Sequence, residues 1–340
     1  MKKKFCKILS LCFFMLVVVQ VQAGYCKSLS INEAVNMALQ NNLDIKIAGK
    51  KEVQAQAELA GIKAQRGVTV SLKSDFSVAG GKTDGIKKEF ERDNSNSISV
   101  TYPVYSGGKD SLNIAIQQQI VQQSQLNTLR TAENIKYDTL KAYYDVLEAK
   151  KTIAVDDESV NNYEKHLINV KQLYSAGSVP KSDLLRSEVE LSNARQTLIT
   201  AKNTYDVDVI TLKNIIKMDR NEPLELTEDF KYEGFNKPLA NCLSFALDHR
   251  KDLEESKIDY IVAQKNIELA KADYKPTVTA SLSSGWNNQP LPGGNDHDYT
   301  AGVSASWNVF DNGVTKANIN AAEAEMEQAQ LTLQQKNDDI

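Results

Sequence analysis

Hydrophobic and polar residues alternate one by one in four short stretches of the chain, at about residues 67–78, 96–105, 276–286 and 298–310. A period of two places the hydrophobic side chains on one face of a β-strand and the polar ones on the other. Each stretch is about 10 residues long, the length of a tilted strand that crosses an outer membrane. The pattern predicts four membrane strands with an apolar face toward lipid. The alternative is a soluble β-sandwich with one solvated face.

The polar face of the predicted strands carries mainly small hydroxyl side chains, which in a membrane would face a water-filled lumen. Four strands cannot close a membrane barrel, because the smallest barrels have about 8. Open strand edges leave backbone groups unpaired in lipid, so we expect several chains to share one barrel. Polar residues 79–95 and 287–297 are expected as loops between the strands. The residues expected on the lumen face are Thr69, Ser71, Lys73, Asp75, Thr277, Thr279, Ser304 and Ser306.

A long helical pattern follows the second strand. From Lys109 to Ala176 the chain has no proline or glycine, and apolar residues recur at steps of three and four. At about 1.5 Å per residue this helix would be roughly 100 Å long, so it needs neighbours to bury its apolar stripes. A second pattern of the same spacing occupies about Ser182–Met218. Together they predict an antiparallel coiled-coil hairpin over about residues 109–218.

The segment between these two helices reads as a tight turn. Gly177 suits the left-handed backbone that ends a helix, and Pro180 suits the start of the next one. Ser178 or Ser182 is expected to cap the second helix, and an acidic residue in its first turn favours the helix dipole. The turn also places apolar groups at the far end of a long rod, where a partner can bury them. The segment is therefore interpreted either as a tip that docks a partner or as a plain hairpin turn. The residues concerned are Tyr174, Gly177, Val179, Asp183, Leu184 and Leu185.

The chain also repeats itself. Glu33–Leu72 aligns with Asn241–Ala280 at an offset of 208 residues, and Tyr102–Ile114 aligns with Trp307–Ile319 at an offset of 205. A period of this length far exceeds the roughly 20 to 50 residues of solenoid repeats. It indicates a duplicated unit, and each copy has the predicted order helix, strand, strand, helix.

We therefore expect a first repeat at residues 24–235 and a second at 236–340. At the 205-residue offset Ile340 corresponds to Ile135, in the middle of the long helix of the first repeat. The second repeat is thus expected to be truncated, and the chain is interpreted as a fragment. Such a fragment keeps four strands but only one complete hairpin, and alone it is not expected to build a sealed duct.

The N-terminus resembles a secretory signal peptide over residues 1–23. Four lysines precede an apolar run from Ile8 to Val19, and small residues follow. A transmembrane anchor is the alternative, but the run is shorter than the roughly 20 residues of a spanning helix. Cys26 is a candidate for lipidation, and an exported chain also permits a disulfide between Cys26 and Cys242. Both possibilities stay open. Removing the four lysines changes the formal charge from −4 to −8.

Catalytic and cofactor motifs are not recognisable. His166, His249 and His297 lack metal-ligand spacing, and Gly107-Gly108-Lys109 lacks the flanking residues of a phosphate loop. No nucleophile with a base and an orienting group stands out, and basic residues form no stripe for nucleic acid. We therefore expect no enzyme activity, no cofactor, no metal and no nucleic-acid partner.

The residues resemble the TolC-like outer membrane efflux proteins along essentially the whole chain after the signal peptide. The resemblance rests on the opening Leu29–Val35, the paired segments Tyr102–Gly108 and Trp307–Gly313, and the turn with Tyr174 and Gly177. Each motif is weak alone, but their order, duplication and spacing are specific. The family implies a mainly α-helical fold, with long helices that form a periplasmic tunnel. It further implies a homotrimer in which each chain gives four strands to a 12-stranded β-barrel.

The resemblance also implies partners and a function. The chain is expected in the outer membrane as a passive duct of a tripartite efflux pump or type I secretion system. Its hairpin turn would meet a periplasmic adaptor protein of an inner-membrane pump or ABC exporter. The turn residues given above match the family's adaptor-contacting turn, although Leu173 stands where many members have Arg. Gate residues of the family lie beyond Ile340 and are not assigned. A periplasmic coiled-coil or adhesin stalk with a soluble β-head is the alternative function.

Overall fold

The computed structural model of the chain describes residues 27–83, 86–232, 234–287 and 297–340, so the predicted signal peptide and Cys26 lie outside it. The chain forms two compact units. The first comprises the residues up to Lys46 together with Ala132–Phe235, and the second comprises Ile47–Thr131 together with Asn236–Ile340. These units cut across the two predicted sequence repeats, because α3 (Leu43–Ala64) and α4 (Lys109–Ser175) each continue from one unit into the other.

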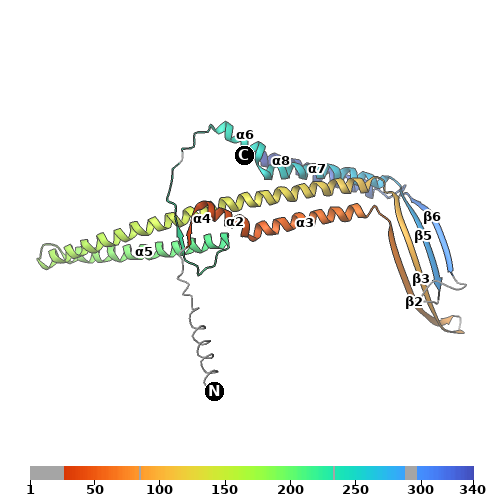
Figure 1. Ribbon diagram of the computed structural model, residues 1–340, viewed down its shortest axis with the longest axis horizontal. Helices are drawn as coiled ribbons and strands as arrows, with labels where there is room; N and C mark the ends of the chain where they lie inside the picture. The colour runs from red at the N-terminus through yellow and green to blue at the C-terminus, as the bar shows by residue number, and fades with distance from the viewer. Residues whose placement is uncertain (1–26, 84–85, 233, 288–296) are drawn as a thin grey trace, which may run out of the picture. The chain divides into compact units, whose positions relative to one another are not determined.

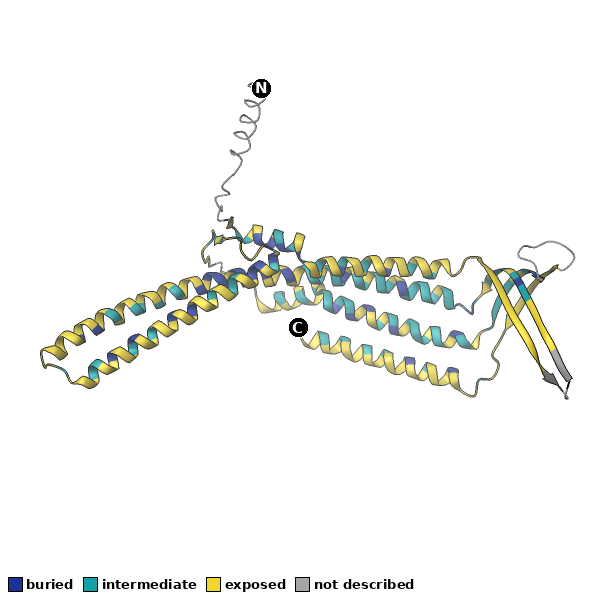
Figure 2. Ribbon diagram, turned by 90° about the horizontal axis from the view of Figure 1, so that it is seen from below, coloured by how far each residue is buried: buried dark blue, intermediate teal, exposed yellow. Residues whose placement is uncertain are grey.

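The first unit is built on a helical hairpin, as the sequence predicts (Figure 1). Helix α4 is continuous over 67 residues, and α5 (Lys181–Ile216) returns antiparallel to it. Ion pairs Arg195–Glu164, at 2.7 Å, and Lys171–Glu188, at 3.9 Å, join the two helices on the surface. Burial follows the predicted seams (Figure 2), whose buried members include Ile135, Thr139, Ala142, Val146, Ala149, Leu167, Val170, Leu191, Leu198, Ala201 and Leu212.

The main core of this unit lies where the hairpin meets α2 (Ile31–Asn41). Tyr143, Leu212 and Ile216 are fully buried there, with Ala34 and Ala38 of α2 packed among them. Helix α2 begins with a capping box, in which Ser30 and Glu33 satisfy each other's backbone N–H groups. After Pro223 the chain forms the short strand β4 (Leu224–Leu226), which pairs in parallel with β1 (Lys27–Leu29). The sequence did not predict β1, which has only three residues.

The second unit contains one sheet of four antiparallel strands in the order β2-β3-β5-β6. The strands are β2 (Thr69–Thr83), β3 (Ile86–Tyr105), β5 (Thr277–Asn287) and β6 (His297–Ser306). All four predicted strands are therefore present, with different ends. Residues 288–296, most of the second predicted loop, lie outside the described residues.

Two strand boundaries differ from the sequence prediction. Most of residues 79–95 was expected as a loop but extends the β2–β3 hairpin, with pairs such as Val78–Arg92 and Ala79–Glu91. Backbone pairing across a hairpin satisfies the N–H and C=O groups even where side chains are charged, so polar composition alone did not mark the strand end. Strand β6 ends at Ser306 rather than near residue 310. There Trp307 turns aside and donates its indole N–H to the carbonyl oxygen of Tyr274 at 2.9 Å.

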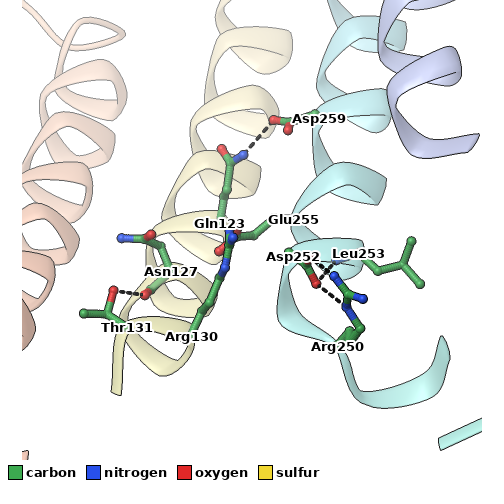
Figure 3. A network of polar contacts seen from close by, with 9 residues as sticks. All are labelled: Gln123, Asn127, Arg130, Thr131, Arg250, Asp252, Leu253, Glu255 and Asp259. Atoms are coloured by element: carbon green, nitrogen blue, oxygen red, sulfur yellow. Dashed lines mark hydrogen bonds and ion pairs between the residues drawn. The ribbon is translucent and has the colours of Figure 1, made fainter. Parts of the chain in front are cut away.

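The helices of the second unit lie side by side in the same order as the strands to which they connect. Most of α3, the first part of α4, α7 (Lys251–Lys271) and α8 (Val314–Asp338) lie side by side in that order (Figures 2 and 3). The helix α6 (Leu239–His249) precedes α7, and the short 3₁₀ helix η1 (Ala272–Tyr274) follows it. Within the described residues, no helix is both long enough and apolar enough to span a membrane.

The sequence repeat is visible in the packing of these helices. Ala55 of α3 and Gln117 of α4 are buried in the first repeat. Their equivalents in the second repeat, Ala263 of α7 and Ala322 of α8, are buried as well. Each helix that enters the sheet thus packs in the same way on the helix that leaves it.

Candidate functional site

The polar face of the sheet brings together all eight residues predicted to face a lumen. Residues directly opposite each other in neighbouring strands point to the same side of a sheet. The register pairs Ser71 with Ser99 and Ser99 with Ser283, and other rows extend the same face. The hydroxyl oxygens of Ser71 and Ser99 are 2.7 Å apart. The pairs that place the predicted residues on this face are Thr69–Thr101, Lys73–Ser97, Asp75–Ser95, Thr101–Ser281, Thr277–Ser306 and Thr279–Ser304.

The eight predicted residues together carry no net charge, although the register places Glu91, Asp93 and Asp298 on the same face. Lys73 and Asp75, two residues apart on the same side of β2, form an exposed ion pair at 2.8 Å. The remaining six predicted residues are Ser and Thr. The face is therefore hydrophilic and suited to contact with water, while its role as a lumen wall stays a prediction.

The opposite face of the sheet is apolar and largely exposed. One row of paired residues runs across all four strands from Val70 to Val100, Leu282 and Ala301. Leu72 is 71% exposed, Leu282 52%, Tyr299 73% and Val303 72%. A continuous apolar surface of this kind is unusual on a soluble protein and marks a surface that meets lipid or another chain. Trp286, at the end of β5 on the same face, is buried.

The hairpin turn ends α4 with a Schellman motif. Gly177 has a φ of +71°, as predicted from its position in the sequence. Its N–H donates to the carbonyl oxygen of Tyr174 at 3.0 Å, and the N–H of Ser178 donates to that of Leu173 at 2.9 Å. The predicted serine cap of α5 is wrong. Pro180 occupies the N-cap position with no side-chain hydrogen bond, because its φ of −75° already sets the entry into the helix.

The six residues predicted to dock a partner gather around this turn. Tyr174 is 40% exposed and Leu185 is 51% exposed, with exposed Leu173 beside them. Val179, Asp183 and Leu184 are half-buried. The turn thus presents apolar side chains together with one carboxylate, and its docking role stays a prediction.

A network of polar contacts joins α4 to α7 in the second unit (Figure 3). Arg130 pairs with Glu255 at 3.0 Å, and the side-chain amide of Gln123 donates to Asp259 at 2.6 Å. Near the sheet, Lys109 forms an ion pair with Asp273. These contacts were not predicted from the sequence. Their only signal was the spacing of three and four among Asp252, Glu255 and Asp259, and the partners lie more than a hundred residues away along the chain.

Electrostatics in this network push two neighbouring carboxyl groups in opposite directions. Hydrogen bonds from Arg250, at 2.6 and 3.0 Å, lower the pKa of Asp252 to about 2. Burial raises the pKa of Glu255 above its ordinary value, and the charge of Arg130 only partly offsets this. One carboxylate oxygen of Glu255 is buried without a hydrogen-bond partner among the described residues. Glu255 therefore occupies a costly position for a charged group.

Metal and cysteine chemistry find no support among the described residues. No group of three or more His, Cys, Asp or Glu side chains is placed to hold a metal ion in that part of the chain. Cys242 on α6 is half-buried and is a free thiol there. Because Cys26 lies outside the described residues, its predicted lipidation and its pairing with Cys242 stay open.

Comparison with known proteins decides the family. The profile of the outer membrane efflux protein family matches residues 34–216 and 242–339, most of the chain, in two segments that fall inside the two predicted repeats. The chain belongs to the outer membrane efflux protein family. This membership confirms the TolC-like resemblance and the predicted outer membrane location. Export by a signal peptide stays a prediction.

Curated relatives of this outer membrane efflux protein are distant. It is 21% identical over 328 residues to the probable outer membrane lipoprotein SilC of Salmonella typhimurium, covering 90% of this chain and 67% of SilC. It is 23% identical over 280 residues to the toluene efflux pump outer membrane protein TtgF of Pseudomonas putida, covering 77% of this chain and 55% of TtgF. The chain thus spans little more than half to two thirds of the length of these relatives.

Solved structures confirm the fold class. The outer membrane channel CmeC of Campylobacter jejuni superimposes with a TM-score of 0.77 at 17% identity, covering 90% of this chain and 67% of CmeC. A crystal structure of CusC gives a TM-score of 0.74 at 16% identity, covering 91% of this chain and 72% of CusC. The mainly helical fold with a duplicated helix–strand–strand–helix unit is therefore that of TolC-like channels.

Proposed function

We propose that this protein is the outer membrane duct of a tripartite efflux pump or a type I secretion system. The observation that carries the proposal is the two-faced sheet, with a hydroxyl-rich face on one side and an exposed apolar face on the other. Strands that cross a membrane need lipid-compatible side chains outside and polar ones toward water inside. The duct is passive, and a partner pump supplies the energy for export.

The sheet edges support a homotrimer. Strands β2 and β6 are the outer strands of the sheet, and each has one row of backbone groups without a neighbouring strand in this chain. In hydrocarbon such unpaired groups cost several kcal/mol each, so the edges must meet other chains. Three copies with four strands each give a 12-stranded barrel, which leaves no edge.

The hairpin turn is the proposed docking site for a periplasmic adaptor protein. Its exposed Leu173, Tyr174 and Leu185 offer an apolar contact, and Asp183 offers a charge for orientation. Apolar side chains at the end of a polar helical hairpin are most simply explained by a partner that covers them. The adaptor in turn connects to an inner-membrane pump or an ABC exporter.

Planar-bilayer recordings of a purified protein that carries both repeats in complete form test the duct directly. We expect single-channel conductance, together with heat-modifiable, SDS-resistant trimers in outer membrane fractions. A chain that stays soluble and monomeric without detergent would overturn the proposal and favour a periplasmic stalk with a soluble β-head. Drug or protein export in cells, with and without the adaptor, then tests the partnership separately.

A further inference from the structure

The far end of the sheet, which lies away from the helices, divides its charges between the two faces (Figure 1). Four carboxylates at paired positions lie on the polar face with Lys73: Asp75, Glu91, Asp93 and Asp298. The carboxylate of Asp298 lies over Gly285, where an added Cβ would come within 2.6 Å of one of its oxygens. These groups make the polar face negative at this end.

The apolar face carries the opposite sign at the same end. Arg92 is exposed there on β3, and His297 is exposed on β6. The amide side chains of Asn94 and Asn96 follow Arg92 along the same face of β3. Among the paired positions of the described strands, none on this face is a carboxylate. An anion therefore meets a cation and hydrogen-bond donors on this face, and carboxylates on the other.

These polar groups begin where the apolar band of the sheet ends. On β5 the apolar face runs from Val278 to Trp286, about 27 Å at about 3.4 Å per residue. With a strand tilt of about 40°, this length covers roughly 21 Å of height, close to the apolar band of about 25 Å in outer-membrane barrels. Asn96 and His297 pair directly with Trp286. They therefore lie at the level of the lipid headgroups, on the side of the membrane away from the helices.

We infer that Arg92, Asn94, Asn96 and His297 form a headgroup patch, which binds the phosphorylated sugar headgroup of a glycolipid in the outer leaflet. The inference rests on the proposed function, because it takes the sheet as the membrane-spanning part and the helices as the periplasmic part. The headgroup patch continues the exposed apolar face, so the acyl chains of the same lipid pack against the apolar rows below it.

The spread of the headgroup patch favours a glycolipid over a lipid with one phosphate. Strands β3 and β6 are two strand spacings apart, roughly 10 Å. Arg92 lies about 14 Å farther along β3 than Asn96, at about 3.4 Å per residue. A single phosphate reaches one end only, whereas linked phosphorylated sugars extend over the whole patch. Arg92 holds a phosphate through paired hydrogen bonds of its guanidinium, and the asparagine amides suit sugar hydroxyls.

Lipid retention by a purified protein that carries both repeats in complete form tests the headgroup patch. The protein is placed in phosphatidylethanolamine nanodiscs that also contain bisphosphorylated lipid A, lipid A without phosphates, or phosphatidylglycerol. After extraction into detergent, native mass spectrometry counts the lipids that stay on the protein. We expect bisphosphorylated lipid A to be retained and the other two lipids to be lost. Retention of phosphatidylglycerol or of phosphate-free lipid A to the same extent would overturn the inference.

Arg92→Gln is expected to lower the amount of retained lipid A roughly tenfold, the effect of one lost charge-assisted hydrogen bond. Arg92→Lys keeps the charge and should retain most of the binding. Lys73→Gln is the matched control, because it removes an exposed cation from the polar face of the same sheet. Equal retention of lipid A in Arg92→Gln and Lys73→Gln would overturn the headgroup patch.

A carboxylate added to one face or the other gives a second test. Asn94→Asp places a carboxylate on the apolar face near Arg92, whereas Ser95→Asp, at the next residue, places one on the polar face opposite Asp75. We expect several-fold less retained lipid A in Asn94→Asp and no change in Ser95→Asp. Equal losses in both variants would contradict binding on the apolar face.

Outcomes for the headgroup patch and for the duct are separable. A protein that conducts ions in bilayers but retains lipid A no better than phosphatidylglycerol would overturn the patch and leave the duct. Retention of lipid A that depends on Arg92, in a protein that does not conduct, would keep the patch and remove the duct.

Discussion

Tyr143 donates its phenolic hydrogen to the carbonyl oxygen of Leu29 over 3.0 Å, although the two residues lie 114 positions apart. The same hydroxyl oxygen accepts the backbone N–H of Glu228 at 3.4 Å. Tyr143 is fully buried in the core of the first unit. One side chain of the long helix thus fastens the last residue of β1 and the segment that follows β4 to the hairpin.

Tyr143→Phe is expected to lower the free energy of unfolding by about 1 kcal/mol, the usual net worth of a buried hydrogen bond. The loss stays small because the carbonyl oxygen of Leu29 keeps a second bond, from the N–H of Thr227 at 3.2 Å. Tyr144→Phe is the control, since Tyr144 is 38% exposed. Urea unfolding in detergent, followed by circular dichroism, should separate the two variants. Equal midpoints would contradict the role given to the hydroxyl.

Glu255 is expected to make stability depend on pH. A carboxyl group whose pKa is raised in the fold binds its proton more tightly there, so its contribution to stability falls as pH rises from about 4.5 through the folded pKa. Glu255→Gln should therefore flatten the decline between pH 4 and pH 7, and Arg130→Gln should steepen it, because the compensating charge is lost. Asp252, with a pKa of about 2, stays ionised throughout this window.

Thermal unfolding across this pH window measures the effect. Glu254→Gln is the control, because Glu254 is a neighbouring carboxylate with 45% of its side chain exposed. Its pH profile should match that of the unmodified protein. An unchanged profile in Glu255→Gln would show that burial does not shift this group.

Periodicity made the long elements predictable from the sequence. Steps of three and four without proline or glycine predicted α4 to within one residue, and strict alternation predicted all four strands of the sheet. The extension of β2 and β3 was not predicted, because pairs such as Ala79 with Glu91 are held by backbone hydrogen bonds, whatever their side chains. Strand β1 escaped because three residues carry no period.

Contacts between the two repeats could not be predicted from the periodicity of the sequence. The pairing of Arg130 with Glu255 depends on which helices become neighbours, and local patterns along either helix leave that open. For the sheet, by contrast, the polar rows were predicted before any register was known, because each strand assigns its own faces. The left-handed conformation of Gly177 was predicted correctly, because it depends only on the backbone. The helix cap predicted at Ser178 or Ser182 was wrong, because Pro180 begins α5 without a side-chain cap.

Adjacent residues of β5 allow the two faces of the sheet to be compared directly. Leu282 lies on the apolar face and Ser283 on the polar face. In a membrane barrel, Leu282→Lys should cost about 2–4 kcal/mol near the bilayer centre, whereas Ser283→Lys should be tolerated. The amount of SDS-resistant trimer in outer membrane fractions measures the difference. Equal losses in both variants would argue against lipid on the apolar face.

At the hairpin turn, Asp183→Arg is expected to abolish cross-linking to the adaptor and export while leaving trimers intact. Asp183 lies in the first turn of α5, where its carboxylate favours the positive end of the helix dipole, so reversing the charge also weakens that turn. Such weakening is worth only about 1 kcal/mol and stays local. Glu190→Arg, the same charge change farther along α5, is the control and should export normally. If Asp183→Arg exports as well as Glu190→Arg does, the turn does not dock the adaptor through this carboxylate.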